Sequence, residues 1–273
     1  MEGIGTPDLL IPGAASPHTY SLRPTDARKL ERARIIVWVG EDLESFMSRP
    51  LAALGNRARI VTVAEGAGLT WLANRAGGGW EPDADGHDHK VGGTKTSRAE
   101  RETDLHLWLD IGNASVIAAL ATQALADADP ANAARYRANL ETLDQRLAAL
   151  DTTLRETLAP AQGKPFLVYH DAFHYFESRY GLNAVGSISA SPDRQPSARR
   201  LREIRAKLAA SGARCIFREP QSAPKAVETV TEGMNVRVGV LDPLGALVPP
   251  GPAAYFTIMT DLGRNLSACL APS

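Results

Sequence analysis

The sequence predicts an α/β fold: two lobes with parallel sheets flanked by helices, joined by a long rigid helix. Short β-branched runs alternate with helical patterns along its 273 residues. These runs are apolar throughout, as is typical of strands that helices cover on both faces. A long helical segment without a strand candidate separates the runs into two groups. With 44% hydrophobic and 22% charged residues, the chain can bury a core of ordinary density.

The predicted first lobe covers residues 1–128. Its strand candidates are residues 8–11, 35–39 and 59–63. Pro24 begins a helix, because proline suits the first helical turn, and a second helix begins near Asn113. The polar, Gly-rich residues 77–102 predict a mobile surface loop.

Residues 129–160 predict the helix that joins the lobes, beginning at Asp129–Pro130 and ending by Pro160 and Gly163. Its apolar residues recur three or four apart and form one stripe: Tyr136, Leu140, Leu143, Leu147, Leu150, Leu154 and Leu158. A coiled-coil partner is the alternative, but the neighbouring charges lack coiled-coil order. Packing of the stripe on its own chain is therefore favoured.

The predicted second lobe covers residues 161–273. Its strand candidates are residues 166–169, 215–217 and 236–240. Helices begin at Pro196–Ser197, continuing through Lys207, and at Pro224, continuing toward Glu232.

The charge and cysteine content exclude several classes of protein. Thirty basic and 31 acidic residues give a net charge of -1, which provides no attraction to nucleic acid or anionic lipid. No apolar run approaches the ~18 residues of a membrane helix, and the first ten residues lack the features of a signal peptide. Cys215 and Cys269 are too far apart for a CxxC motif, so they form either two buried thiols or one bridge.

Four candidate metal ligands lie where chain segments converge, because ligands of parallel sheets bind beyond the carboxyl ends of the strands. They are His18, after residues 8–11; His106, ahead of the helix near Asn113; His170, after residues 166–169; and Asp242, after residues 236–240. Three imidazoles and one carboxylate favour zinc over magnesium or calcium. The predicted metal site lies in the cleft between the lobes.

A zinc-dependent hydrolase is the alternative to a metal-binding function. Three protein ligands with an open fourth position would activate water. The chain has no HExxH motif, however, and no general base is tied to a ligand segment. Residues 186–189 do not form GxSxG, and residues 92–96 lack the glycine spacing of a phosphate loop. We therefore expect a protein that is not an enzyme.

Four segments resemble, in the same order, the zinc-binding proteins of bacterial high-affinity zinc ABC transporters: residues 12–26 with 37–40, 104–110, 169–173 and 241–245. The resemblance runs from about Pro12 to Leu270. It implies two α/β lobes bridged by a rigid helix, with the metal between them. It also implies a monomeric periplasmic receptor that delivers Zn²⁺ to a membrane permease, with His18, His106 and His170 as ligands and Asp242 or water completing the site. Some relatives are adhesins, so binding of a host factor is a third possible role implied by the resemblance.

The resemblance also bears on the metal. Manganese and iron receptors of the same family, which are the alternative, place a carboxylate where this chain has His170, and imidazole suits zinc. Some zinc members have an acidic residue at the position of Pro17, which leaves Asp242 or water as the fourth ligand. His87 and His89 resemble a reduced His-rich loop that captures or senses metal, although a solvated loop without function is the alternative.

Three further expectations follow from family and chemistry. The matching cysteines are bridged in similar zinc receptors, which implies a disulfide between Cys215 and Cys269 in the oxidising periplasm. Glu219 follows a strand and is a candidate to orient a ligand histidine, and a contact between the lobes is the alternative. Family members begin with a signal peptide, a strand and a helix, and residues 1–5 resemble the end of that helix. We therefore expect this sequence to lack the signal peptide and the first strand–helix unit.

Overall fold

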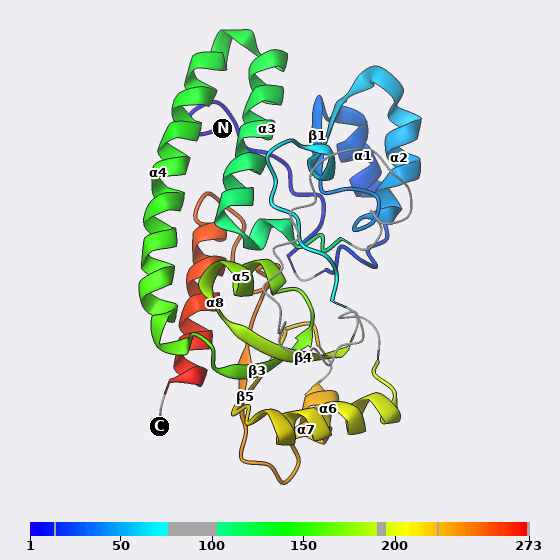
Figure 1. The fold of residues 1–273 in the computed structure, drawn as a ribbon. Helices are drawn as coiled ribbons and strands as arrows, with labels where there is room; N and C mark the ends of the chain where they lie inside the picture. The colour runs from blue at the N-terminus through cyan, green and yellow to red at the C-terminus, as the bar shows by residue number, and fades with distance from the viewer. Residues whose placement is uncertain (14, 76–102, 190–194, 223, 272–273) are drawn as a thin grey trace.

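The computed structural model describes residues 1–13, 15–75, 103–189, 195–222 and 224–271. These residues form two parallel sheets with helices packed on them, and the helix α4 (Ala133–Leu158) runs alongside both parts (Figure 1). The predicted α/β class is confirmed. None of the described helices combines the length and the apolar composition needed to cross a membrane.

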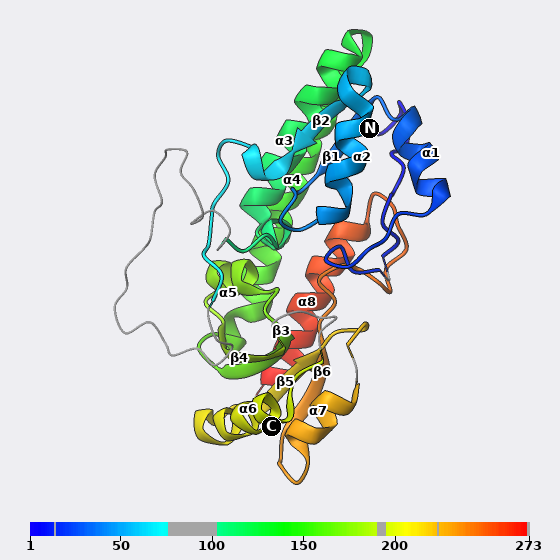
Figure 2. The same cartoon turned by 90° about the vertical axis from the view of Figure 1, so that its right-hand side faces the viewer.

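The first lobe consists of the smaller, two-stranded sheet and the helices beside it. Its strands β1 (Ile35–Trp38) and β2 (Arg59–Thr62) are parallel. The helices α1 (Pro24–Arg32) and α2 (Ser48–Leu54) lie beside this sheet, and α3 (Ile111–Ala128) also packs on it (Figure 2). One apolar cluster holds α1, β1 and α2 together: Leu30, Ile36, Met47, Leu51, Leu54 and Ala58.

The predicted strand at residues 8–11 is wrong. This segment has no regular secondary structure, and Leu9 is 52% exposed. A strand exists only when a neighbour completes its backbone ladder. No strand of the described chain pairs with these residues, and the Lys29 ammonium donates to the Leu9 carbonyl oxygen at 2.9 Å.

The second lobe is the larger sheet with its helices. All four strands are parallel, in the order β4 (Asn183–Ser189), β3 (Pro165–His170), β5 (Cys215–Arg218) and β6 (Arg237–Val240). On one face, α6 (Ala198–Ser211) and α7 (Pro224–Thr231) cover Leu167 and Tyr169. On the other, α5 (His174–Tyr180), α8 (Ala254–Leu270) and α4 cover Phe166 and Val168.

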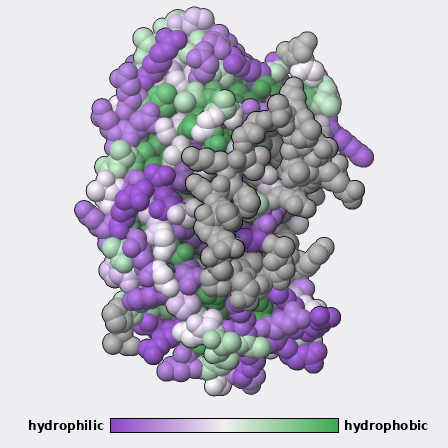
Figure 3. Space-filling model, in the orientation of Figure 1, coloured by the Kyte–Doolittle hydropathy of each residue, from purple (hydrophilic) through white to green (hydrophobic). Residues whose placement is uncertain are grey.

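The predicted linking helix is present as α4. Its stripe is buried at Tyr136, Leu147, Leu150, Leu154 and Leu158, against α3 toward one end and α8 toward the other. Gly263 of α8 allows close approach, because a Cβ there would lie 2.6 Å from Leu154 Cδ2. The opposite face of α4 is hydrophilic along the left of Figure 3. The stripe is thus covered by its own chain, whereas the division at residues 128 and 160 stays a prediction.

The predicted disulfide between Cys215 and Cys269 is confirmed. It joins the first residue of β5 to the last turn of α8, with the two Cα atoms 6.1 Å apart. The bond therefore fastens the C-terminal helix, which also packs on α4, to a central strand of the second lobe.

Candidate metal centre

Three histidines from three distant segments converge between the lobes. His18 lies in the loop before α1, His106 precedes the 3₁₀ turn Leu107–Leu109, and His170 is the last residue of β3. One ring nitrogen from each lies within 4.8 Å of the others. The ring centroids are 4.9 to 5.6 Å apart. Such an arrangement of imidazoles suits a divalent first-row metal ion.

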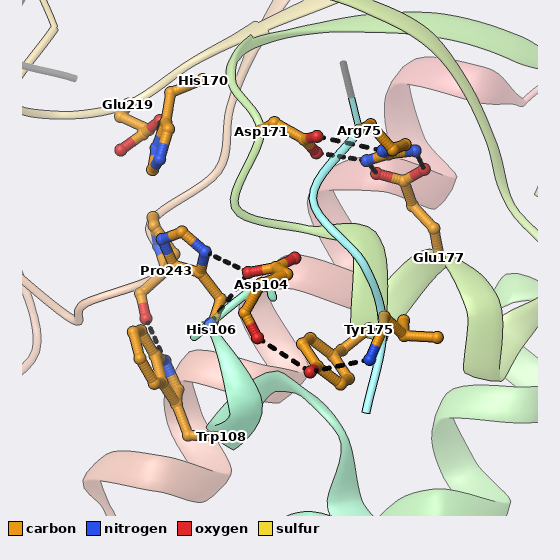
Figure 4. Close-up of polar contacts among 11 residues, drawn as sticks. Arg75, Asp104, His106, Trp108, His170, Asp171, Tyr175, Glu177, Glu219 and Pro243 are labelled. Carbon is orange, nitrogen blue, oxygen red and sulfur yellow. Dashed lines mark hydrogen bonds and ion pairs between the residues drawn. The ribbon is translucent and has the colours of Figure 1, made fainter. Parts of the chain in front are cut away.

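Asp104 orients His106 (Figure 4). Its Oδ1 atom contacts His106 Nδ1 at 2.7 Å and accepts the His106 backbone N–H at 2.9 Å. Burial is the largest single effect and lowers the pKa of His106. The charge and hydrogen bond of Asp104, together with the charges of Glu219 and Asp171, outweigh it, so the net pKa is raised. With Nδ1 engaged by the carboxylate, Nε2 is the nitrogen that would be available to a metal ion.

Glu219 holds His170 in the same way. Its Oε1 atom lies 3.2 Å from His170 Nδ1, and both side chains are buried. The Ser222 hydroxyl accepts the Glu219 backbone N–H at 3.1 Å and fixes the turn after β5. Glu219 therefore lies where it can orient the His170 ring, as its position after a strand predicts.

The loop that contains His18 lies against the second lobe. A Cβ on Gly13 would lie 3.0 Å from the Gly245 carbonyl oxygen, a tight contact that glycine avoids. Ser16 is buried, and its hydroxyl accepts the His18 backbone N–H at 3.3 Å. These contacts place His18 at the boundary of the two lobes.

Asp242 does not belong to the histidine group. Its two carboxylate oxygens accept the backbone N–H groups of Leu244 and Leu247 at 3.3 and 3.2 Å. Its role as the fourth ligand stays a prediction. His87 and His89, in the predicted loop of residues 77–102, lie outside the described residues.

A partly buried ion-pair cluster adjoins His170 and was not predicted from the sequence. Arg75 binds both Asp171, the residue after His170, and Glu177 of α5. Burial raises the pKa of Asp171 despite the Arg75 charge. Four carboxyl groups and one guanidinium therefore lie around the histidines. The carboxyl groups belong to Asp104, Glu219, Asp171 and Glu177, and the guanidinium belongs to Arg75. The excess of acidic groups favours a cation there.

Asp104 was also missed as an orienting residue. The sequence feature that could have indicated its role is its position two residues before His106, a candidate ligand. The fold explains its placement, because the Tyr175 hydroxyl donates to the Asp104 carbonyl oxygen at 2.8 Å and accepts the Leu72 N–H at 3.1 Å. Tyr175 thereby joins the first-lobe segment that contains His106 to α5 of the second lobe.

Two parallel-sheet lobes, a linking helix and a histidine cluster at their boundary define a two-lobed α/β binding protein. The chain belongs to the family described as ZnuA, zinc-uptake complex component A, periplasmic, whose profile matches residues 4–269.

Named relatives agree with this assignment, and solved structures share the fold. The chain is 39% identical over 294 residues to the high-affinity zinc uptake system protein ZnuA of Brucella suis, covering 99% of this chain and 87% of that protein. The protein of the same name from Yersinia pestis is 33% identical over 273 residues, covering 98% and 86%. A crystal structure of ZnuA superposes with a TM-score of 0.77 at 23% identity, covering 97% of this chain and 90% of that chain. The periplasmic zinc binding protein TroA from Treponema pallidum gives 0.74 at 25%, covering 95% and 88%.

Proposed function

We propose that this protein is the zinc receptor of an ABC importer, which binds Zn²⁺ in the periplasm and delivers it to a membrane permease. The observation that supports this most strongly is the convergence of His18, His106 and His170 within 4.8 Å from both lobes. Zinc is the cargo of such a receptor. The protein acts as a monomer in this proposal.

The donor set favours zinc among the divalent metals. All three clustered donors are imidazole nitrogens, which zinc prefers, whereas manganese and magnesium prefer oxygen donors. Asp104 and Glu219 increase the basicity of two of these imidazoles without being members of the cluster. The fourth position is filled by Asp242 or by water in this proposal. His87 and His89 serve as an auxiliary capture site.

The same carboxylates argue against hydrolysis. A hydrolase needs a general base that reaches the metal-bound water. Asp104 and Glu219 each contact the Nδ1 atom of a ligand histidine, which is an orienting role. We therefore propose binding and transfer of the metal, without chemical conversion.

The experiment is a zinc titration of protein freed of metal by chelation, with His170→Ala compared with His174→Ala. His174 lies one turn later, outside the histidine cluster, so its replacement is the matched control. His170→Ala should weaken zinc binding by more than the about 10- to 100-fold that loss of an orienting partner costs. Retention of wild-type affinity by His170→Ala would refute the site.

Thermal unfolding gives an independent measure. A ligand that binds only the native state adds about 2.7 kcal/mol to its stability at a hundredfold excess over Kd. Zinc should therefore raise the melting temperature, and manganese should raise it much less. An equal effect of manganese would favour the alternative of a manganese receptor.

A further inference from the structure

Trp108 connects the His106 segment of the first lobe to the second lobe at two points. Its indole Nε1–H donates to the Pro243 carbonyl oxygen at 2.8 Å (Figure 4). Its own carbonyl oxygen accepts the Tyr255 hydroxyl of α8 at 2.8 Å. The indole also contacts the His106 ring, with centroids 5.4 Å apart.

The loop that Trp108 holds, residues 241–253, is itself ordered by Asp242. The Asp242 carboxylate accepts the amides of Leu244 and Leu247, and the Val248 amide donates to the Gly245 carbonyl oxygen at 3.0 Å. Gly245 has a positive φ of 70°, which favours glycine. A shift of Pro243 would therefore move this loop as a unit.

The same loop touches the His18 segment. The Gly245 carbonyl oxygen lies so close to Gly13 that a Cβ there would be 3.0 Å away. One second-lobe loop thus contacts both first-lobe segments that contain ligand histidines, at Trp108 beside His106 and at Gly13 near His18. His170 belongs to the same lobe as this loop. The spacing of all three imidazoles consequently depends on how the loop is seated.

We propose that Trp108 is a positioning residue for the metal: its indole hydrogen bond seats the loop 241–253 against the His106 turn and so keeps the ligands of the two lobes in register. This inference rests on the proposed zinc-binding function. Trp108 does not coordinate the metal. Loss of the indole bond loosens the boundary between the lobes and lets zinc leave faster, while each ligand side chain stays present.

The experiment compares Trp108→Phe with Trp38→Phe. Trp38 provides a matched control, because its indole donates to Thr62 Oγ1 at 3.0 Å within the first-lobe sheet. Zinc dissociation is measured by mixing the loaded protein with excess chelator, and stability by urea unfolding of the metal-free protein. Both variants lose one hydrogen bond of similar length, so both should lose comparable stability. Only Trp108→Phe should release zinc faster, by about fivefold.

A metal-independent readout follows the loop directly. Hydrogen exchange of the Leu244 and Leu247 amides in metal-free protein should accelerate in Trp108→Phe and not in Trp38→Phe. Tyr255→Phe, which removes the second contact, should also accelerate zinc release. The double variant Trp108→Phe/Tyr255→Phe should then show less than the product of the single effects, because both bonds hold the same boundary.

The proposal is overturned if Trp108→Phe releases zinc at the wild-type rate, or if Trp38→Phe accelerates release equally. It is also overturned if hydrogen exchange of the Leu244 and Leu247 amides is as slow in Trp108→Phe as in the wild-type protein. Failure of the wild-type protein to bind zinc would instead refute the proposed function, so the two failures are distinguishable.

Discussion

Replacing Asp104 by asparagine should weaken zinc binding, although Asp104 is not one of the three clustered candidate ligands, His18, His106 and His170. The substitution preserves the size of the side chain and an oxygen acceptor, but it removes the negative charge that faces His106 Nδ1 at 2.7 Å. A hydrogen bond to a charged group contributes about 1.5–3 kcal/mol, against about 0.5–1.5 kcal/mol for a neutral one. The difference predicts a loss of affinity of roughly tenfold or more, within the range of about 10- to 100-fold typical of partners that orient metal ligands.

The contact lengths also predict a ranking. Glu219 lies 3.2 Å from His170 Nδ1, so Glu219→Gln should cost less affinity than Asp104→Asn. Asp151→Asn is the control, because Asp151 accepts hydrogen bonds from Arg179 and Tyr180 and contacts no ligand histidine. The assay is calorimetric zinc titration against a competing chelator. Equal affinities for Asp104→Asn and Asp151→Asn would refute the orienting role.

Four further predictions concern pH, metal choice and the disulfide. The pKa of His106 is raised above its ordinary value of 6.5, and protons compete with zinc for its ring nitrogens. Zinc affinity should therefore increase with pH through and beyond 6.5. In Asp104→Asn the same increase in zinc affinity should occur at lower pH. In the metal-free protein, unfolding measured against pH should show the His106–Asp104 pair fully stabilising between the ordinary Asp104 pKa of 3.8 and the ordinary His106 pKa of 6.5. The contribution should be lost as pH rises through the folded pKa of His106 and as pH falls through that of Asp104. His170→Asp should lower zinc affinity and increase the manganese-to-zinc affinity ratio, measured by titration, because a carboxylate suits manganese better; an unchanged ratio would contradict this. Replacing Cys215 and Cys269 together by serine should lower the unfolding free energy by about 4 kcal/mol, since the bridge spans 54 residues, and urea unfolding without such a loss would contradict the estimate.

The parts of the fold with strong local patterns could be predicted. The strands β1, β2, β3, β5 and β6 coincide with apolar runs, and α4 coincides with its stripe. The strand β4 was missed because Asn183–Ser189 mixes small and polar residues and has no apolar run. Residues 8–11 have such a run yet form no strand, because pairing depends on a neighbouring strand and not on the segment itself.

The candidate ligands of the site could be predicted from the sequence, whereas most of the residues that surround and orient them could not. His18, His106 and His170 could be chosen because they follow strand candidates or precede a helix, and because their segments resemble those of a known family. The contact between Asp104 and His106 depends on local chain geometry that residue spacing alone does not specify. The Arg75 cluster joins residues about 100 positions apart, and no local pattern indicates such a pairing.

The most direct test of the central claim is zinc-edge X-ray absorption of the protein loaded with one equivalent of Zn²⁺. Coordination by His18, His106 and His170 predicts three imidazole nitrogens at about 2.0–2.1 Å, with one oxygen from Asp242 or water as the fourth donor. A first coordination sphere with fewer than three imidazoles, or one made mainly of oxygen, would contradict it.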